Sequence, residues 1–213
     1  MDLKGNHTHP LLDILLAAAE GRFPPVDGAV TVLPALGPGR ECSVAFTGHA
    51  VVATDLAPDE VRGRKPDGFG GSLAPDFLRW LAGPAGDIGV LDATLVGRGR
   101  GGDRLPPRPD LADHPRVRYA MAIRSDVRVF GDERGVVTLG SGLAGRPELS
   151  IEAAPDGQGR GIGRALLVDA LSLVPSGAPV FAAVSPGNAR SLRAFLAVGF
   201  TPIGSEVLIE PAR

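Results

Sequence analysis

Short extended runs bounded by glycine and proline predict five strands in the second half of the chain. They lie at residues 127–130, 135–139, 148–153, 180–184 and 201–209. The first two flank a turn at residues 131–134 and therefore predict a β-hairpin. The run at residues 180–184 is apolar throughout, which is typical of a strand buried on both faces.

Apolar residues at helical spacing predict three helices among these strands, at residues 112–124, 163–171 and 189–198. The last of them follows Asn188, a helix N-cap residue, and ends at Gly199. For the first we expect an apolar side formed by Val117, Ala120, Met121 and Ile123. Because helices alternate with strands, the class is α/β (α+β) with a mixed sheet.

The first half of the chain has a weaker pattern. It predicts helices at residues 11–20 and 76–81 and strands at residues 29–33, 43–46, 49–54 and 88–96. Residues 63–72 are rich in glycine and charge and read as a loop. Residues 97–109 combine glycine, arginine and proline and are the best linker candidate. We therefore expect an N-terminal region at residues 1–110 and a second domain at residues 111–213.

A weak internal similarity connects the two halves. Residues 68–71, a helix and then the strand from Ile88 parallel residues 161–163, a helix and then the strand from Val180. One interpretation is an atypical N-terminal half that is a degenerate copy of the second. The other is chance in a chain rich in glycine and proline. The order of the strands in residues 28–97 and 126–185 distinguishes the two.

Composition is that of a globular protein able to bury a core of its own. The chain has 213 residues, of which 44% are hydrophobic and 22% charged. A net charge of -2 gives no reason to expect nucleic acid as a partner. Asp13 interrupts the apolar run at residues 11–19, so we expect no membrane segment. Cys42 is the single cysteine, which excludes an internal disulfide and a multi-cysteine metal site and indicates a cytoplasmic protein.

The most informative segment is Gln158-Gly159-Arg160-Gly161-Ile162-Gly163, between a predicted strand and a predicted helix. A glycine-rich turn that opens a helix presents backbone N–H groups at the positive end of the helix dipole. Such a turn suits a pyrophosphate. The spacing matches neither the dinucleotide-binding fingerprint nor the Walker loop. The alternative is a tight turn that binds nothing.

The same six residues fit the pattern Gln/Arg-x-x-Gly-x-Gly/Ala and resemble the pyrophosphate loop of the GNAT N-acyltransferases, which use acetyl-CoA. The downstream order of strand, Asn-led helix, Gly-Phe and strand also resembles that family. The matching residues are Asn188, Ser191, Phe195, Gly199 and Phe200. The resemblance covers residues 113–213. It implies a GNAT-like mixed, mostly antiparallel central sheet flanked by helices.

The resemblance also implies a site for acetyl-CoA. The backbone amides of Gly159, Arg160, Gly161, Ile162, Gly163 and Arg164, preceded by Gln158, would bind the pyrophosphate. The strand before the loop would pair with the pantetheine through Ile151 and Ala153. Asn188, with Ser191 and Phe195 on the same helix, would line the pantetheine arm. An ordinary N-cap role for Asn188 is compatible with this.

The catalytic groups are less clearly marked. The family often carries a glutamate base on the strand before the loop, and Glu148 and Glu152 are the candidates, with Glu148 favoured. Either could instead be a solvent-facing carboxylate. The family's usual acid is a tyrosine at the position of Phe195, which has no proton to donate. The only tyrosine, Tyr119, lies in another segment.

Two functions follow from the resemblance. One is an N-acetyltransferase that moves an acyl group from acetyl-CoA to an amine of a small molecule or a protein. The other is a non-catalytic acyl-CoA-binding or sensing protein, which Phe195 favours. An α/β-hydrolase is disfavoured because the chain has no Gly-x-Ser-x-Gly. His49 could face a substrate cleft or be structural. No metal is implied, and monomer and homodimer both stay open.

Overall fold

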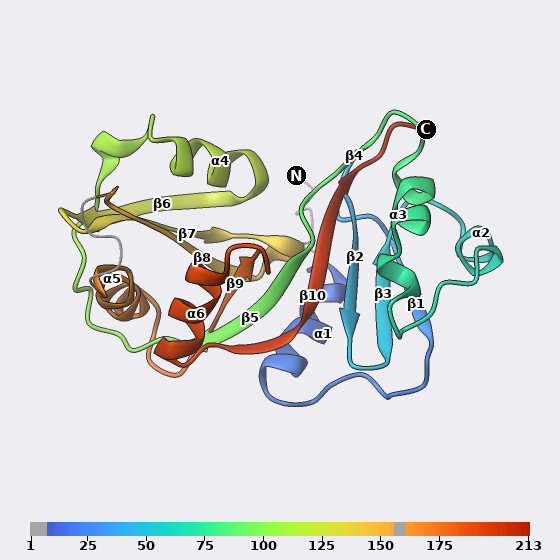
Figure 1. Cartoon of the computed structure of the whole chain (residues 1–213), viewed down its shortest axis with the longest axis horizontal. Coiled ribbons are helices and arrows are strands. Elements are labelled where there is room, and N and C mark those ends of the chain that lie inside the picture. Colours follow the sequence, from blue (N-terminus) through green and yellow to red (C-terminus); the bar gives the residue numbers. More distant parts are fainter. Residues whose placement is uncertain (1–7, 156–160) are drawn as a thin grey trace, which may run out of the picture. The chain divides into compact units, whose positions relative to one another are not determined.

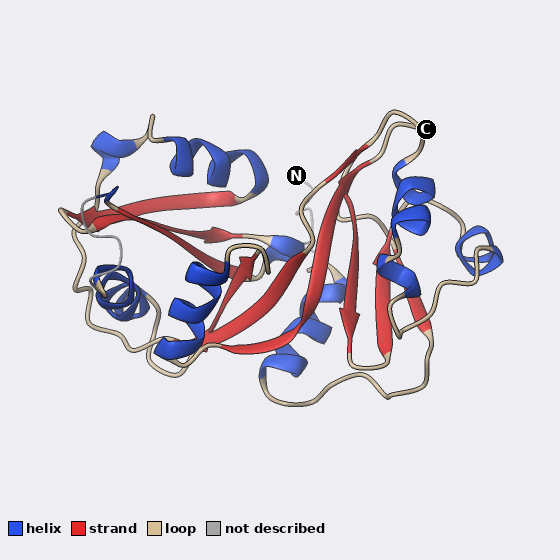
Figure 2. Cartoon of the chain, viewed as in Figure 1, coloured by secondary structure: helices blue, strands red, loops and turns tan. Residues whose placement is uncertain are grey.

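The computed structural model describes residues 8–155 and 161–213, which form two compact units. Unit 1 contains residues 8–89, Leu143–Gly145 and Val207–Arg213. Unit 2 contains Val90–Gly142 and Arg146–Glu206. In both, helices flank β-strands (Figures 1 and 2). The fold class is the mixed, mostly antiparallel α/β arrangement predicted from the sequence.

In unit 1 the strand order is β1-β3-β2. Its strands are β1 (Val30–Leu33), β2 (Glu41–Phe46), β3 (His49–Ala53) and β4 (Asp87–Ile88). Its helices are α1 (Pro10–Ala19), α2 (Pro58–Gly63), the 3-10 turn η1 (Gly71–Leu73) and α3 (Pro75–Ala82). The strand β1 is parallel to β3, and β2 is antiparallel to it. Phe77, Leu78 and Leu81 of α3 bury their side chains against Val52 and Val207.

In unit 2 the strand order is β10-β5-β9-β8-β7-β6. The strands are β5 (Asp92–Arg98), β6 (Ser125–Asp132), β7 (Gly135–Ser141), β8 (Pro147–Ala153), β9 (Pro179–Val184) and β10 (Thr201–Glu210), the last of which ends in unit 1. The helices are α4 (Pro115–Ile123), α5 (Ile162–Ala170) and α6 (Ala189–Val198), with 3-10 turns η2 (Pro109–Leu111) and η5 (Leu171–Leu173). Only β8 and β9 are parallel neighbours among the strands described in this unit.

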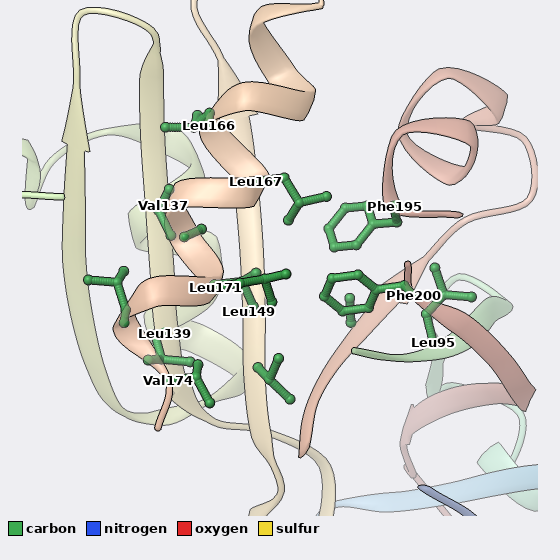
Figure 3. Close-up of a cluster of buried hydrophobic side chains, with 14 of the residues drawn as sticks. Leu95, Val137, Leu139, Leu149, Leu166, Leu167, Leu171, Val174, Phe195 and Phe200 are labelled. Atoms are coloured by element: carbon green, nitrogen blue, oxygen red, sulfur yellow. The ribbon is translucent and has the colours of Figure 1, made fainter. Parts of the chain in front are cut away.

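Strand alternation gives the unit 2 sheet one apolar and one polar face. Leu149, Ala182 and Leu95 share the apolar face with Val137 and Leu139, as the strand registers require. Helices α5 and α6 cover this face (Figure 1). Figure 3 shows Leu166 and Leu167 of α5 and Leu171 of η5 directed at these strands, and Phe195 of α6 against Phe200. Helix α4 packs against β6, β7 and β8.

Most predicted elements are confirmed, and α6 has the bounds expected from its periodicity. The predicted strand at residues 88–96 is instead divided into β4 and β5, because Ile88 pairs with Ile209 while Asp92 pairs with Glu206. Residues 97–109 are not a linker between domains. Leu105 is buried in the core of unit 2, and the chain on both sides of it belongs to that unit.

The two compact units also differ from the division expected at residue 110. Strand β5 lies before that position, yet it pairs with β9 along its length, so the change between units falls at Gly89. The internal similarity is not supported by the strand order. The parallel neighbour of β3 is the earlier strand β1, whereas the parallel neighbour of β8 is the later strand β9.

Candidate functional site

The strands β8 and β9 diverge after a single point of pairing. They run parallel, but among the described residues only Glu148 and Phe181 are partners. On its other side β8 pairs with β7 throughout, from Pro147 to Ala153. The second half of β8 is therefore hydrogen-bonded along one edge only. The result is a wedge between two parallel strands in the middle of the sheet.

Backbone groups of Ile151 and Ala153 face the wedge. The N–H of Ala154 donates to the carbonyl of Arg134, on the side of β7. Because successive residues of a strand direct their N–H and C=O groups to opposite edges, Glu152 also faces β7. Ile151 and Ala153 then direct theirs away from β7, toward the wedge. The two residues expected from the sequence to pair with a pantetheine thus have their polar groups on the open edge.

The first turn of α5 begins close to the end of β8. Gly161 is its N-cap, in the left-handed conformation with φ 80°. A Cβ built on Gly163 would lie 3.8 Å from the Cβ of Ala153. The N–H groups of Ile162 and Gly163 are in the first turn, where helical N–H groups lack an intrahelical acceptor. The N–H of Arg164 already donates to the carbonyl of Gly161, at 3.0 Å. Gln158, Gly159 and Arg160 lie outside the described residues.

The residues expected on the helix after β9 differ in their surroundings. Asn188 is exposed and caps α6, since its Oδ1 accepts from the N–H of Ser191 at 3.1 Å. Phe195 is only 4% exposed, and its ring meets Phe200 edge to face at 4.9 Å. Phe195 therefore packs in the core of unit 2. The cofactor contacts of Asn188, Ser191 and Phe195 stay predictions.

The polar face of the sheet carries a buried cluster of charged groups at the point where the wedge closes. Arg146 is fully buried and donates to Glu148 at 2.8 and 3.0 Å and to Glu206 at 2.6 Å twice. Its guanidinium also lies 5.3 Å from the ring of Phe181. Arg124, at the end of α4, pairs with the other oxygen of Glu148 at 2.6 Å. The hydroxyl of Thr94 donates to Glu206 at 2.5 Å.

Glu148 is consequently held in its ionised form. Burial by itself would raise the pKa of Glu148, but the charges of Arg146 and Arg124 outweigh burial and lower the pKa below its ordinary value. A carboxylate with a lowered pKa and two arginine partners is a poor proton acceptor. Glu152, the other expected base, lies at the surface, with one oxygen 3.3 Å from Nε of Arg116. Neither glutamate has the surroundings of a buried, unpaired base.

Asp92 is the acid of this cluster that sequence reasoning missed. It opens β5 and lies directly opposite Glu206 on β10. Burial and the negative charges of Glu206 and Glu148 raise the pKa of Asp92 from 3.8 to about 6, while Arg146 opposes the rise. A signal was present in the sequence, because Asp92 interrupts an otherwise apolar run, where acids are rare.

In unit 1, His49 is buried and both its ring nitrogens are engaged. Its Nδ1 lies 2.8 Å from Oδ1 of Asp27, and its Nε2 lies 3.0 Å from Oγ1 of Thr31. The same oxygen of Asp27 accepts from the N–H of Ala29. These contacts fix the turn before β1 to the start of β3, which is the structural role left open for His49.

Two findings concern the described residues as a set. None of the helices within residues 8–155 and 161–213 is both long and apolar enough to cross a membrane. Over the same ranges, histidine, cysteine, aspartate and glutamate form no group of three or more that could hold a metal ion.

Comparisons with known proteins give similarity to solved structures alone. No protein-family model and no curated protein matches the chain. A protein assigned to the GNAT family from Novosphingobium aromaticivorans is 12% identical, with a TM-score of 0.43 over 61% of this chain and 69% of that one. A GNAT-family acetyltransferase from Colwellia psychrerythraea is 11% identical, with a TM-score of 0.38 over 59% and 57%. A Drosophila protein is 13% identical, with a TM-score of 0.44 over 76% and 60%.

This chain therefore spans under two thirds of the length of the Colwellia and Drosophila proteins. At these identities and TM-scores the similarity establishes neither the family nor the chemistry of this chain.

Proposed function

We propose that unit 2 binds an acyl-CoA in the wedge between β8 and β9 and transfers the acyl group to an amine. The observation that carries the proposal is the single point of pairing between these strands, together with a glycine-capped helix whose first turn lies close to the end of β8. Parallel neighbours in a sheet are normally paired along their length, so the open edge needs another hydrogen-bonding partner. The amides of a pantetheine arm supply such a partner.

The residues present fit the expected donor. Ile151 and Ala153 offer backbone groups to the two amides of a pantetheine, as a further strand would. Ile162 and Gly163 offer N–H groups to a pyrophosphate at the positive end of α5. The left-handed Gly161 allows the chain to enter the helix without a side chain at this point. Bound acyl-CoA would supply an acyl group activated as a thioester.

The acceptor would approach from the polar face of the sheet beside α4, which packs against β6, β7 and β8 there, since α5 and α6 cover the other face. An amine of a small molecule, a protein N-terminus or a lysine suits a face where the acids Glu148, Glu206 and Asp92 outnumber the arginines Arg146 and Arg124 by one. The charge of that face is our only basis for proposing a positively charged acceptor.

A non-catalytic acyl-CoA-binding protein is the second candidate function. The observation that favours it is Phe195, which has no hydroxyl to protonate a leaving thiolate and is buried against Phe200. In a transferase of this design, the thiolate would take its proton from solvent. The two candidates predict the same binding and differ only in turnover.

Calorimetry with CoA tests the binding site. Ala153→Pro removes the N–H on the open edge and leaves the pairing with β7 in place, so we expect about tenfold weaker binding. Ala153→Ser keeps the N–H and should bind like the wild type. Gly161→Asp places a negative charge beside the pyrophosphate and should abolish binding, whereas the uncharged Gly161→Asn, which tolerates the left-handed conformation, should retain most of it.

If all four variants bind CoA as tightly as the wild type, the wedge is not the CoA-binding site. A thiol-release assay with acetyl-CoA and a panel of primary amines then separates the two functions. Thiol release that depends on the amine supports transfer. Binding of CoA without thiol release, whichever amine is supplied, supports the non-catalytic protein.

A further inference from the structure

We infer that Asp92 accepts the proton of the acceptor amine, and that Glu148 and Glu206 act as positioning residues around it. The inference rests on the proposed transferase function. It assigns the base to β5, a strand outside the segment that the sequence indicated.

Register places Asp92 beside the wedge. Ala93 pairs with Val184, the last residue of β9, so Asp92 lies just past the end of one of the two strands that border the wedge. Thr94 and Glu206 share its face of the sheet, because Thr94 follows two residues later and Glu206 is directly opposite. This is the polar face, from which an amine would reach the wedge.

Among the three acids of the cluster, Asp92 is the accessible one. Glu148 is 3% exposed and Glu206 is 4% exposed, whereas Asp92 is half-buried. The two guanidinium groups are committed to the buried pair, Arg146 to both glutamates and Arg124 to Glu148. Within the described part of the chain, Asp92 has no ion-pair partner. Its carboxylate is therefore the one that can exchange a proton with a ligand.

The charges around Asp92 are suited to this role. Three acids face two arginines, so the cluster carries one excess negative charge when every group is ionised. The groups that face Asp92 are Glu206 from β10, Glu148 from β8 and Arg146; burial and the two acids raise its pKa to about 6. A base with this pKa is ionised at neutral pH yet takes up a proton far more readily than an ordinary aspartate.

Acetyl-CoA and a protonated amine give an amide, CoA thiol and one proton. The bond from the amine nitrogen to the acyl carbon forms, and the bond from that carbon to sulfur breaks. The nitrogen loses two protons, one before it attacks and one as the amide forms, and the carboxylate of Asp92 takes each in turn and passes it to solvent. The departing thiolate takes one proton back from solvent, which leaves one proton released.

Titration of Asp92 by carboxyl ¹³C NMR tests the inference without turnover, the resonance being assigned from its loss in Asp92→Asn. An apparent pKa near 6 is expected, and a value at or below 4 would overturn the inference. Removing the negative charge across the strand pair, in Glu206→Gln, should lower the pKa of Asp92. No change would show that the cluster does not tune this group.

Thiol release from acetyl-CoA, with the most reactive amine of the panel, tests the role in transfer. Asp92→Asn should lower kcat/KM by about 10²-fold or more and leave the affinity for CoA unchanged. Asp92→Glu should recover part of the loss, and the exposed control Asp87→Asn should stay within about twofold of the wild type. Wild-type kcat/KM should rise with pH through a pKa near 6.

Full turnover by Asp92→Asn, with CoA still bound, would overturn the assignment of Asp92 and leave the proposed function standing. Bound CoA without turnover in the wild type would remove transfer, and the role of Asp92 with it. Absence of CoA binding would remove the proposed function itself.

Discussion

Replacing Arg146 by methionine should destabilise unit 2 more than any other single removal of a charge from it. Arg146 is fully buried and holds Glu206 through two hydrogen bonds of 2.6 Å. In Arg146→Met, Glu148 keeps Arg124, but Glu206 keeps, of its partners among the described residues, the hydroxyl of Thr94 alone. Removing one partner of a buried ion pair typically costs about 3–5 kcal/mol, and we expect a loss of that size in the free energy of unfolding.

The cost arises because the buried carboxylate of Glu206 loses its arginine partner, so a second substitution that removes this charge should reduce the cost. In the double variant Arg146→Met/Glu206→Gln, the side chain opposite Asp92 would be a neutral amide that can still accept from Thr94. We expect a cost of about 1–3 kcal/mol for the pair of changes, less than for Arg146→Met alone. The exposed Arg104, 3.7 Å from Asp169, gives the control Arg104→Met, which should cost at most about 1 kcal/mol.

The free energies are measured by urea denaturation, followed by far-ultraviolet circular dichroism and by the emission of Trp80, the only tryptophan, which lies in unit 1. A cost below about 1 kcal/mol, or a double variant whose loss equals the sum of the two single losses, would refute this reasoning.

Three further predictions concern stability. The pKa of Asp92 is raised from 3.8 to about 6, so ionised Asp92 lowers the free energy of unfolding by about 3 kcal/mol before its partial exposure is taken into account. Asp92→Asn should therefore stabilise the protein by about 1–2 kcal/mol at pH 8 in urea denaturation. The gain should fade as the pH falls from 6 to 4, where Asp92 of the wild type takes up its proton. Phe195→Ala should cost about 3–5 kcal/mol in thermal or urea unfolding, because it empties a core site beside Phe200; a loss under 1 kcal/mol would show that the ring is not packed there. Asn188→Ala should cost about 1 kcal/mol through the lost cap of α6, and the control Asn188→Ser should restore most of it.

Local patterns were enough to predict most of the fold. The strands of unit 2 and helix α6 follow from periodicities of two and of 3.6 residues, and the cap at Asn188 follows from its residue type. The division of residues 88–96 did not follow, because the two parts pair with different segments, Ile88 with Ile209 and Asp92 with Glu206. An apolar run predicts a strand but does not show that its two parts pair with different segments.

The candidate site was only half predictable for the same reason. The backbone part, from Ile151 to Gly163, lies within one continuous segment. Its order of strand, glycine-rich turn and helix can be predicted from the residue types. The side-chain part joins residues far apart, such as Arg146 with Glu206, 60 residues away, and Thr94 with Glu206, 112 residues away. A sequence shows that Glu148 is acidic, but not that two arginines will neutralise it in the fold.

The central claim is that the open edge of β8 and the first turn of α5 together bind coenzyme A. Titration of the ¹⁵N-labelled protein with CoA, followed through the backbone amide resonances, tests it most directly. The account predicts the largest shifts at Ile151, Ala153, Ile162 and Gly163, and small ones in β1, β2 and β3. Shifts concentrated in those three strands, or none at millimolar CoA, would contradict it.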